Sequence, residues 1–426
     1  MTLTATPPAV PFFGAWVVRG AFVLAAFGWG VGFYGLPVFL QAVVQRTGWP
    51  LTLVSAAMTL HFLAGALVIT RLPRWHARVG VPATLVCGSV LTMAGLLGWA
   101  LAWLPWQLFA AALLSGMGWV TMGAVAVNAV IAPWFVRTRP LALSRAYNGA
   151  SIGGVLFSPL WVALIAGFGF AGAVAAVGLV TVVLMTALGR WVFAHTPQGL
   201  GQQPDGEVAA PSAREAAVAD HAALPGARLW RDRAFQSLAF GMAAGLFAQI
   251  GLLAHLFSLL APGLGAQHAG LVMGGATACA IAGRSAATRL LPRVGDRRIV
   301  AAAGYAVQAL GSLLMLMADG VATGTMLLGI VLFGSGLGNA TSLPPLIAQS
   351  DFARQDTARV VALVVAIAQA SYAFAPALFG VLLSASAAAG QASGSPRSTA
   401  LFFIVAAGVQ ALAGAALLAG RRRGRR

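Results

Sequence analysis

One arginine lies inside an apolar run, where a charged side chain is costly to place. Arg284 is about 16 residues into a predicted helix over 268–291. A charge within a membrane needs a partner or water, so such a residue usually has a function. Its planar guanidinium can bind a carboxylate through two parallel hydrogen bonds. The sequence therefore predicts an anion site at Arg284, and the alternative is a structural arginine that reaches to the membrane surface.

Two histidines inside other apolar runs are the groups there that titrate near neutral pH. His61 lies midway along a run over 51–70, and His255 lies in a run over 235–261. No Asp or Glu lies inside any of the runs, so a transported proton would use one of these imidazoles or the substrate itself. The alternative is a histidine that packs and hydrogen-bonds in the interior. Both are candidates for proton coupling, and His61 also for substrate contact.

Polar residues recur at helical spacing on otherwise apolar helices. One face of the predicted helix over 142–166 carries, at i, i+3, i+4 and i+7, Ser144, Tyr147, Asn148 and Ser151. Such a stripe faces either a water-filled cavity or a neighbouring helix to which it hydrogen-bonds. Similar stripes are Ser335, Asn339 and Ser342, and Gln369 and Tyr372. The candidate substrate contacts besides Arg284 and His61 are Tyr34, Asn148, Ser151, Gln249, Asn339, Gln369 and Tyr372.

Twelve apolar runs must position these residues, each long enough for a membrane helix of about 20 residues. They are 12–40, 51–70, 81–103, 106–132, 142–166 and 170–193, then 235–261, 268–291, 299–318, 324–349, 359–386 and 398–420. We predict an all-α membrane protein with 12 transmembrane helices in two six-helix bundles. The predicted domains are 1–193 and 235–426, joined by a cytoplasmic linker over 194–234 that is rich in Ala, Pro, Gly and charge.

Composition and charge agree with a multi-pass membrane protein. Hydrophobic residues make up 59% of the 426 residues and charged residues 8%, against about 25% charged in soluble domains. Of the 26 basic residues, all Arg, Arg19 and Arg284 lie well inside runs and Arg46 and Arg397 on the side opposite the linker, which leaves 22 in or next to the linker-side segments. Positive residues favour the cytoplasmic side, so we expect a bacterial inner membrane with both termini cytoplasmic. No basic patch with interleaved aromatics indicates a nucleic-acid partner.

The two groups of helices carry similar residues at corresponding positions. The segment Thr70 to Arg74 follows the second run, and the similar segment Thr288 to Arg293 follows the eighth. Two six-helix halves related by a repeat are typical of transporters that alternate access to a central site by rocking one half against the other.

The segment after the fourth run resembles a known signature. Between Trp134 and Gly149 it has an aromatic residue, Phe, two spaced arginines, Leu-Ala and small residues. This resembles the signature of the monocarboxylate porters and the related oxalate–formate antiporters in the major facilitator superfamily. The pair Gly48-Trp49 after the first run also resembles that group. The resemblance covers nearly the whole chain and implies the major facilitator fold. It also implies monocarboxylate transport as an antiporter or a symporter.

Three positions depart from those relatives. Residues 11–16 lack the acidic residue that the porters have ahead of the first helix. Ala280 stands four residues before Arg284, where proton-coupled members have Asp, and the eleventh helix has no basic residue beyond Arg359 at its start, where the oxalate antiporters add one. The departures argue against an Asp–Arg proton pair and against oxalate as substrate.

The resemblance also implies a gate in the cytoplasmic loops. Arginines after the second run stand at the place of the superfamily's loop motif, and the second copy after the eighth run includes Asp296. We expect ion pairs and helix-dipole contacts to hold these loops together in the outward-facing state. The expected gating residues are Arg71, Arg74, Arg78, Arg137, Arg139, Asp296 and Arg297.

We therefore expect a secondary active or facilitative transporter that moves a small organic anion, a monocarboxylate, across the cytoplasmic membrane by alternating access. The alternatives are an exporter or permease for a larger amphipathic compound, such as a drug or siderophore, and a transporter-like solute receptor. The sequence has no metal-ligand cluster, nucleophile–base pair or phosphate loop, so we expect no catalytic residue, no metal and no cofactor, and hence not an enzyme. The expected partners are the anion, the lipid bilayer and a proton as candidate co-substrate, with the protein a monomer.

Overall fold

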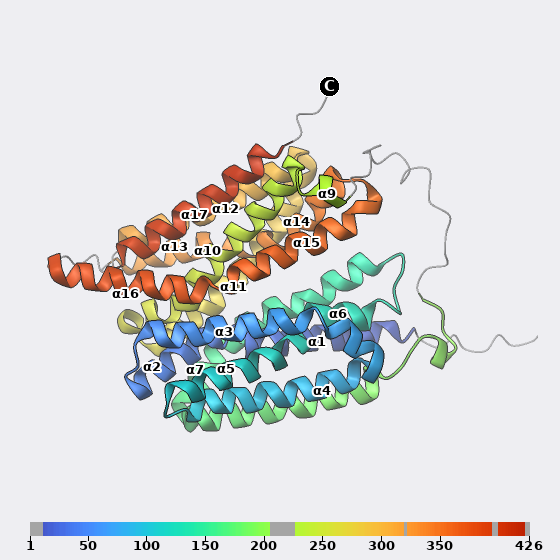
Figure 1. The fold of residues 1–426 in the computed structure, drawn as a ribbon, viewed down its shortest axis with the longest axis horizontal. Coiled ribbons are helices and arrows are strands. Elements are labelled where there is room, and N and C mark those ends of the chain that lie inside the picture. Colours follow the sequence, from blue (N-terminus) through green and yellow to red (C-terminus); the bar gives the residue numbers. More distant parts are fainter. Residues whose placement is uncertain (1–11, 205–225, 319–321, 394–398, 422–426) are drawn as a thin grey trace, which may run out of the picture.

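A computed structural model describes residues 12–204, 226–318, 322–393 and 399–421 of the chain. In this part of the chain the regular elements are all helical (Figure 1). We call α1 to α7 the N-terminal half and α9 to α17 the C-terminal half. Figure 1 shows them as two layers of long helices, the first half below the second. Residues 205–225 of the expected linker lie outside the described residues.

The helices of the N-terminal half are α1 (Gly14–Gly32), α2 (Leu36–Thr47), α3 (Leu51–Ile69), α4 (Leu72–Leu101), α5 (Pro105–Trp119), α6 (Ala124–Ile131) and α7 (Arg139–Leu188). Those of the C-terminal half are α9 (Gly226–Leu229), α10 (Arg233–Leu264), α11 (Ala266–Val294), α12 (Arg297–Ala318), α13 (Thr323–Leu337), α14 (Asn339–Asp351), α15 (Arg354–Tyr372), α16 (Ala375–Ser393) and α17 (Ala400–Ala419).

The described helices supply the twelve predicted crossings. Ten stretches are long and apolar enough to cross a membrane, and one of them, Arg139–Phe193, has 55 residues. Gly169 divides this stretch into two crossings, because its φ of 69° breaks the helix in a region that glycine adopts most easily. The remaining crossing is the 29-residue α11, which is less apolar because it carries Arg284 and several Gly and Thr residues.

Four of the crossings are interrupted near their middle. The breaks lie between α1 and α2 at 33–35, between α5 and α6 at 120–123, between α13 and α14 at Gly338, and between α15 and α16 at 373–374. Interrupted backbone at membrane depth is tolerated where protein or a water-filled cavity surrounds it. Three of the predicted substrate contacts, Tyr34, Asn339 and Tyr372, lie next to these breaks.

The two halves contact each other at one end of the molecule and diverge at the other (Figure 1). We call the end with residues 194–204 and the start of α10 the linker end, and the opposite end the far end. The main contacts between the halves are α7 with α11, α3 with α16, and α2 with α10. On the far-end side of the break between α15 and α16, the backbone N–H of Ala377 donates to Thr59 Oγ1 over 3.1 Å. The far end is therefore closed between the halves.

Exposed tryptophans lie at both ends of the bundle. Those at the linker end are Trp16, Trp75, Trp191 and Trp230, and those at the far end are Trp103 and Trp106. Indole rings favour the two membrane–water interfaces, so these two groups mark the levels at which the lipid headgroups surround the helices.

Candidate functional site

Arg284 lies on α11 where the two halves meet. Tyr34, at the break between α1 and α2, lies within electrostatic range of the Arg284 guanidinium. On its other side it packs on the break between α13 and α14, because a Cβ added at Gly338 would lie 3.1 Å from Arg284 Nε. Helical side chains lean toward the N-terminus of their helix. The guanidinium therefore leans from α11 toward the middle of the molecule.

Arg284 has no protein anion beside it among the described residues. The ion pairs between described residues do not include Arg284. Its Nε atom is buried without a hydrogen-bond partner. Ala280, one turn earlier on α11, is buried and carries no charge. A cation with these surroundings is suited to an anionic ligand that approaches from between the halves.

Four aromatic rings connect Arg284 with the break between α15 and α16. Tyr34 contacts Phe33 with ring centroids 5.0 Å apart, Phe33 lies 5.9 Å from Phe62, and Phe62 lies 5.9 Å from Tyr372. We call these four residues the aromatic chain. The contact between Phe62 on α3 and Tyr372 on α15 joins the two halves. The aromatic chain therefore lies between the Arg284 region and the closed far end.

Two other predicted contacts have amides without protein partners. Asn148 on α7 is exposed and Gln369 on α15 is half-buried, and neither side-chain amide has a hydrogen-bond partner within the described residues. Ser151 is buried one turn further along α7. Asn148 and Gln369 are therefore able to donate to a ligand.

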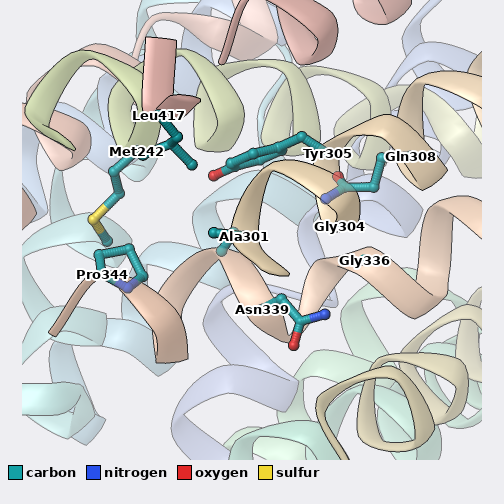
Figure 2. A pocket seen from close by; sticks show the side chains of 10 residues that line it. Met242, Ala301, Gly304, Tyr305, Gln308, Gly336, Asn339, Pro344 and Leu417 are labelled. Carbon is teal, nitrogen blue, oxygen red and sulfur yellow. The ribbon is translucent and has the colours of Figure 1, made fainter. Parts of the chain in front are cut away.

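Gln249 and Asn339 lie inside the C-terminal half. Gln249 is buried and donates to Gln308 Oε1 over 2.8 Å. Figure 2 shows Gln308, Tyr305 and Asn339 around a small cavity of about 10 Å³, roughly the space of one water molecule. The cavity is lined by this half alone, and the Asn339 amide points away from the Tyr305 ring (Figure 2). This cavity is too small for an organic substrate, and the Gln249 amide is already used.

Both histidines are fully buried and hydrogen-bonded within their own halves. His61 Nδ1 lies 2.9 Å from Ser115 Oγ, and its ring stacks on Trp119. His255 Nε2 lies 2.9 Å from the carbonyl oxygen of Pro376, so this nitrogen must carry the hydrogen. These contacts fit the packing alternative for both histidines.

Three residues of the polar stripes, unlike Asn148 and Gln369, hydrogen-bond to protein groups. Tyr147 accepts a hydrogen bond from Asn128 Nδ2 over 2.7 Å and lies 3.2 Å from the Ala124 carbonyl. Ser335 and Ser342 donate to the carbonyls of Leu332 and Gly338, three and four residues earlier in the chain. The Tyr147–Asn128 bond joins α7 to α6 and fits the helix-packing alternative, whereas the two serine bonds are local.

The predicted gating residues do not join the halves in this conformation. The five on the N-terminal half are exposed, namely Arg71, Arg74, Arg78, Arg137 and Arg139. Asp296 accepts from the backbone N–H of Arg298 and from Arg421 Nε, and Arg297 donates to the Leu346 carbonyl. The contacts of Asp296 and Arg297 that the structure places lie within the C-terminal half. A latch between the halves remains an expectation for the state in which the linker end closes.

Sequence reasoning missed the buried partners of Arg298. This arginine donates to Asp351 Oδ2 over 2.7 Å, and its other donors bond to Ser237 and to the carbonyls of Ala234 and Leu417. It thereby joins the linker ends of α10, α12, α14 and α17. Nothing in the sequence separates Arg298 from half-buried Arg297 except its place on the apolar face of α12.

Comparison with protein families finds one that covers most of the chain. The sequence model of the Major Facilitator Superfamily matches residues 20–376. Monocarboxylate transporter 11 of Mus musculus is 30% identical over 246 residues, which are 55% of this chain. The match covers about half the length of that relative, at 50%.

Solved structures of similar fold are membrane transporters. A mutant of the nucleoside transporter NupG has a TM-score of 0.70 at 13% identity, over 95% of this chain and 100% of that one. A bacterial homologue of the human lysosomal transporter Spinster, inward-facing and occupied, has a TM-score of 0.69 at 15% identity, over 97% and 99%. A D-xylose–proton symporter has 0.67 at 14%, over 95% and 97%. At these identities the likeness concerns the fold.

Proposed function

We propose that this chain, which belongs to the Major Facilitator Superfamily and is therefore a membrane transporter that works by alternating access, carries a small organic anion, a monocarboxylate. The observation that supports this most is Arg284, a cation between the two halves without a protein counter-ion among the described residues. A substrate carboxylate supplies that counter-ion.

Electrostatics favours an anion at this place. The interior of a helical bundle has a low effective dielectric constant, so the attraction between a guanidinium and a carboxylate is much stronger there than in water. The planar guanidinium can offer two parallel N–H donors to one carboxylate. Further donors to the anion are the Tyr34 hydroxyl and the amides of Asn148 and Gln369. The match to a monocarboxylate transporter over half its length supports the same substrate class.

The site draws residues from both halves, which transport by rocking requires. Arg284 and Gln369 belong to the C-terminal half, and Tyr34 and Asn148 to the N-terminal half. A ligand that contacts both halves binds one arrangement of them better than another, and so shifts the equilibrium between arrangements. In this account residues 1–193 and 235–426 move as two six-helix bundles, tethered by the linker over 194–234.

The arginines give the orientation of this cycle. Because most of them gather at the linker end, we place that end in the cytoplasm of a bacterial cell, with the protein in the inner membrane. The far end is closed and the linker end diverges, so the conformation is the one in which the site faces the cytoplasm. A proton that accompanied the anion would have to use His61, His255 or the substrate itself.

Binding to the purified protein tests the proposal. Isothermal titration calorimetry measures the affinity for acetate, pyruvate and lactate and for the neutral amide of each. Because an acid and its amide have similar shapes, the difference in affinity reports the effect of the charge. We expect acids to bind and amides not to bind. The substitution Arg284→Gln should weaken acid binding by a factor of about 100, and Arg284→Lys by less, because an ammonium cannot form the two-pronged contact.

Arg289→Gln is the matched control, since Arg289 is exposed on the same helix. It should bind acids as the wild type does. Acid affinity within twofold of wild type in folded Arg284→Gln would refute the proposal and favour a structural arginine.

A further inference from the structure

We infer that the substrate is a monocarboxylate with an aromatic body, whose ring lies against the aromatic chain while its carboxylate lies on Arg284. This inference rests on the proposed function and narrows it to one class of acid. Three features of the surroundings of Arg284 support it: the aromatic side chains near the guanidinium, their exposed surface, and the positions of the other arginines.

The aromatic rings begin next to the cation. Tyr34 lies within electrostatic range of Arg284, and the ring of the preceding residue, Phe33, lies 5.0 Å from the Tyr34 ring. Of the four rings, Phe62 is buried, whereas Phe33, Tyr34 and Tyr372 are half-buried and retain accessible surface. A ligand ring can therefore reach three of them.

The rings are held rigidly from behind. Phe62 lies 5.6 Å from Trp119, and the Trp119 Nε1 donates to the Gly28 carbonyl over 2.9 Å. Phe33 stacks on the same indole at 6.4 Å. A preformed wall binds a ligand ring with little loss of side-chain freedom. Offset and edge-to-face contacts favour an aromatic ligand over a saturated one of the same size.

Among the described residues no second arginine contacts the aromatic chain, which favours a ligand with one carboxylate. Arg19, the other arginine deep inside an apolar run, has its guanidinium 4.9 Å from the ring of exposed Trp16. Arg19 and Tyr34 are separated by 15 positions, mostly within α1, about 22 Å at 1.5 Å per residue. A second carboxylate near Arg284 would therefore be desolvated without a partner.

A matched set of ligands separates these features. Acetate has the carboxylate alone, phenylacetate adds an aromatic ring, cyclohexylacetate adds a saturated ring of similar size, and phenylacetamide has the ring without the charge. Titrations use the full chain in detergent or nanodiscs. We expect phenylacetate to bind at least tenfold more tightly than acetate and several-fold more tightly than cyclohexylacetate. Phenylacetamide and oxalate should bind at least tenfold more weakly than phenylacetate.

Two variants assign the preference to the aromatic chain. Tyr372→Leu should reduce phenylacetate affinity by about tenfold and leave acetate affinity within twofold. Phe374→Leu is the control, because Phe374 lies two residues further along, is exposed and makes no ring contact with the aromatic chain. It should leave both affinities unchanged. Folding of each variant is verified by its melting temperature.

The outcomes distinguish this inference from the proposed function. If phenylacetate binds no better than acetate while both depend on Arg284, or if Tyr372→Leu leaves the ratio unchanged, the inference is wrong and the anion proposal stands. If phenylacetate does not bind at millimolar concentration, the inference is likewise wrong. If phenylacetamide binds as tightly as phenylacetate and Arg284→Gln has no effect, the anion proposal itself fails.

Discussion

Arg284 and Arg298 are two arginines of the C-terminal half whose surroundings differ, the first half-buried and the second buried. Arg298 is 2% exposed and has four acceptors around its guanidinium. Arg284 has no such set within the described chain. A buried charge persists only with partners. Arg298 is therefore a structural cation, and we propose that a ligand supplies the partner of Arg284.

This difference predicts the effect of removing Asp351. Asp351→Ala leaves Arg298 buried and without its carboxylate. This should reduce the free energy of unfolding by about 3–5 kcal/mol and lower the melting temperature. Arg421→Ala is the control, because it removes the pair between Arg421 and Asp296, whose side chains are 43% and 32% exposed. An exposed pair contributes less than about 1 kcal/mol. Equal losses of thermal stability in the two variants would contradict the structural role of Arg298.

The histidine contacts predict the coupling behaviour. Because His61 and His255 are each bonded within their own half, we expect the double variant His61→Gln, His255→Gln to keep any stimulation of uptake by a pH gradient. Its melting temperature should fall, because two buried contacts are altered. The measurement is uptake into proteoliposomes with and without an imposed gradient. Stimulation that disappears in the double variant, on folded protein, would make the histidines proton carriers.

At the scale of elements, glycines set how closely α7 and α11 approach across the two halves. A Cβ added at Gly274 would lie 2.7 Å from the carbonyl oxygen of Val155, whereas one added at the next residue, Gly275, would meet nothing within 4 Å. Backbone at that distance must move to admit the atom. This close approach is part of what closes the far end.

The neighbouring glycines give a matched prediction. Gly274→Ala should separate α7 from α11 and reduce the closed population of the far end, whereas Gly275→Ala should leave it unchanged. Spin labels at Phe168 and Leu271, both exposed, report the distance between these helices once Cys87 and Cys279 are replaced by Ser. We expect a longer mean distance in Gly274→Ala only. A shift of the same size in both variants would show that helix propensity, and not the contact, is responsible.

At the scale of the whole molecule, charge and hydropathy predict the orientation in the membrane. The exposed tryptophans mark two levels along the bundle, and the arginines gather beyond one of them. Reporter fusions at Gly206 and Gly424, which lie outside the described residues, should therefore both give the cytoplasmic signal. A periplasmic signal at either position would break the twelve-crossing topology.

The sequence predicts those features that depend on local composition, and misses those that depend on tertiary neighbours. Runs of apolar residues locate the crossings. The cost of placing a charge inside such a run singles out Arg284 as a candidate site residue. The predicted loop around Arg74 is instead the helical start of α4, bent at Gly80 with φ of 82°. The first turns of α4 contain several polar residues, so a search for apolar runs does not predict them as helix. Helical spacing gives the face of a residue but not its partner, so neither the Gln249–Gln308 pair nor the aromatic chain could be predicted.

Uptake into proteoliposomes tests the central claim most directly, namely that Arg284 carries the negative charge of the substrate between the two halves. The substrate is the radiolabelled monocarboxylate that the purified protein binds most tightly. The account predicts saturable uptake by the wild type and by Arg289→Gln, and a loss of at least tenfold in Arg284→Gln at equal reconstitution. Uptake by Arg284→Gln within twofold of the wild type would contradict it.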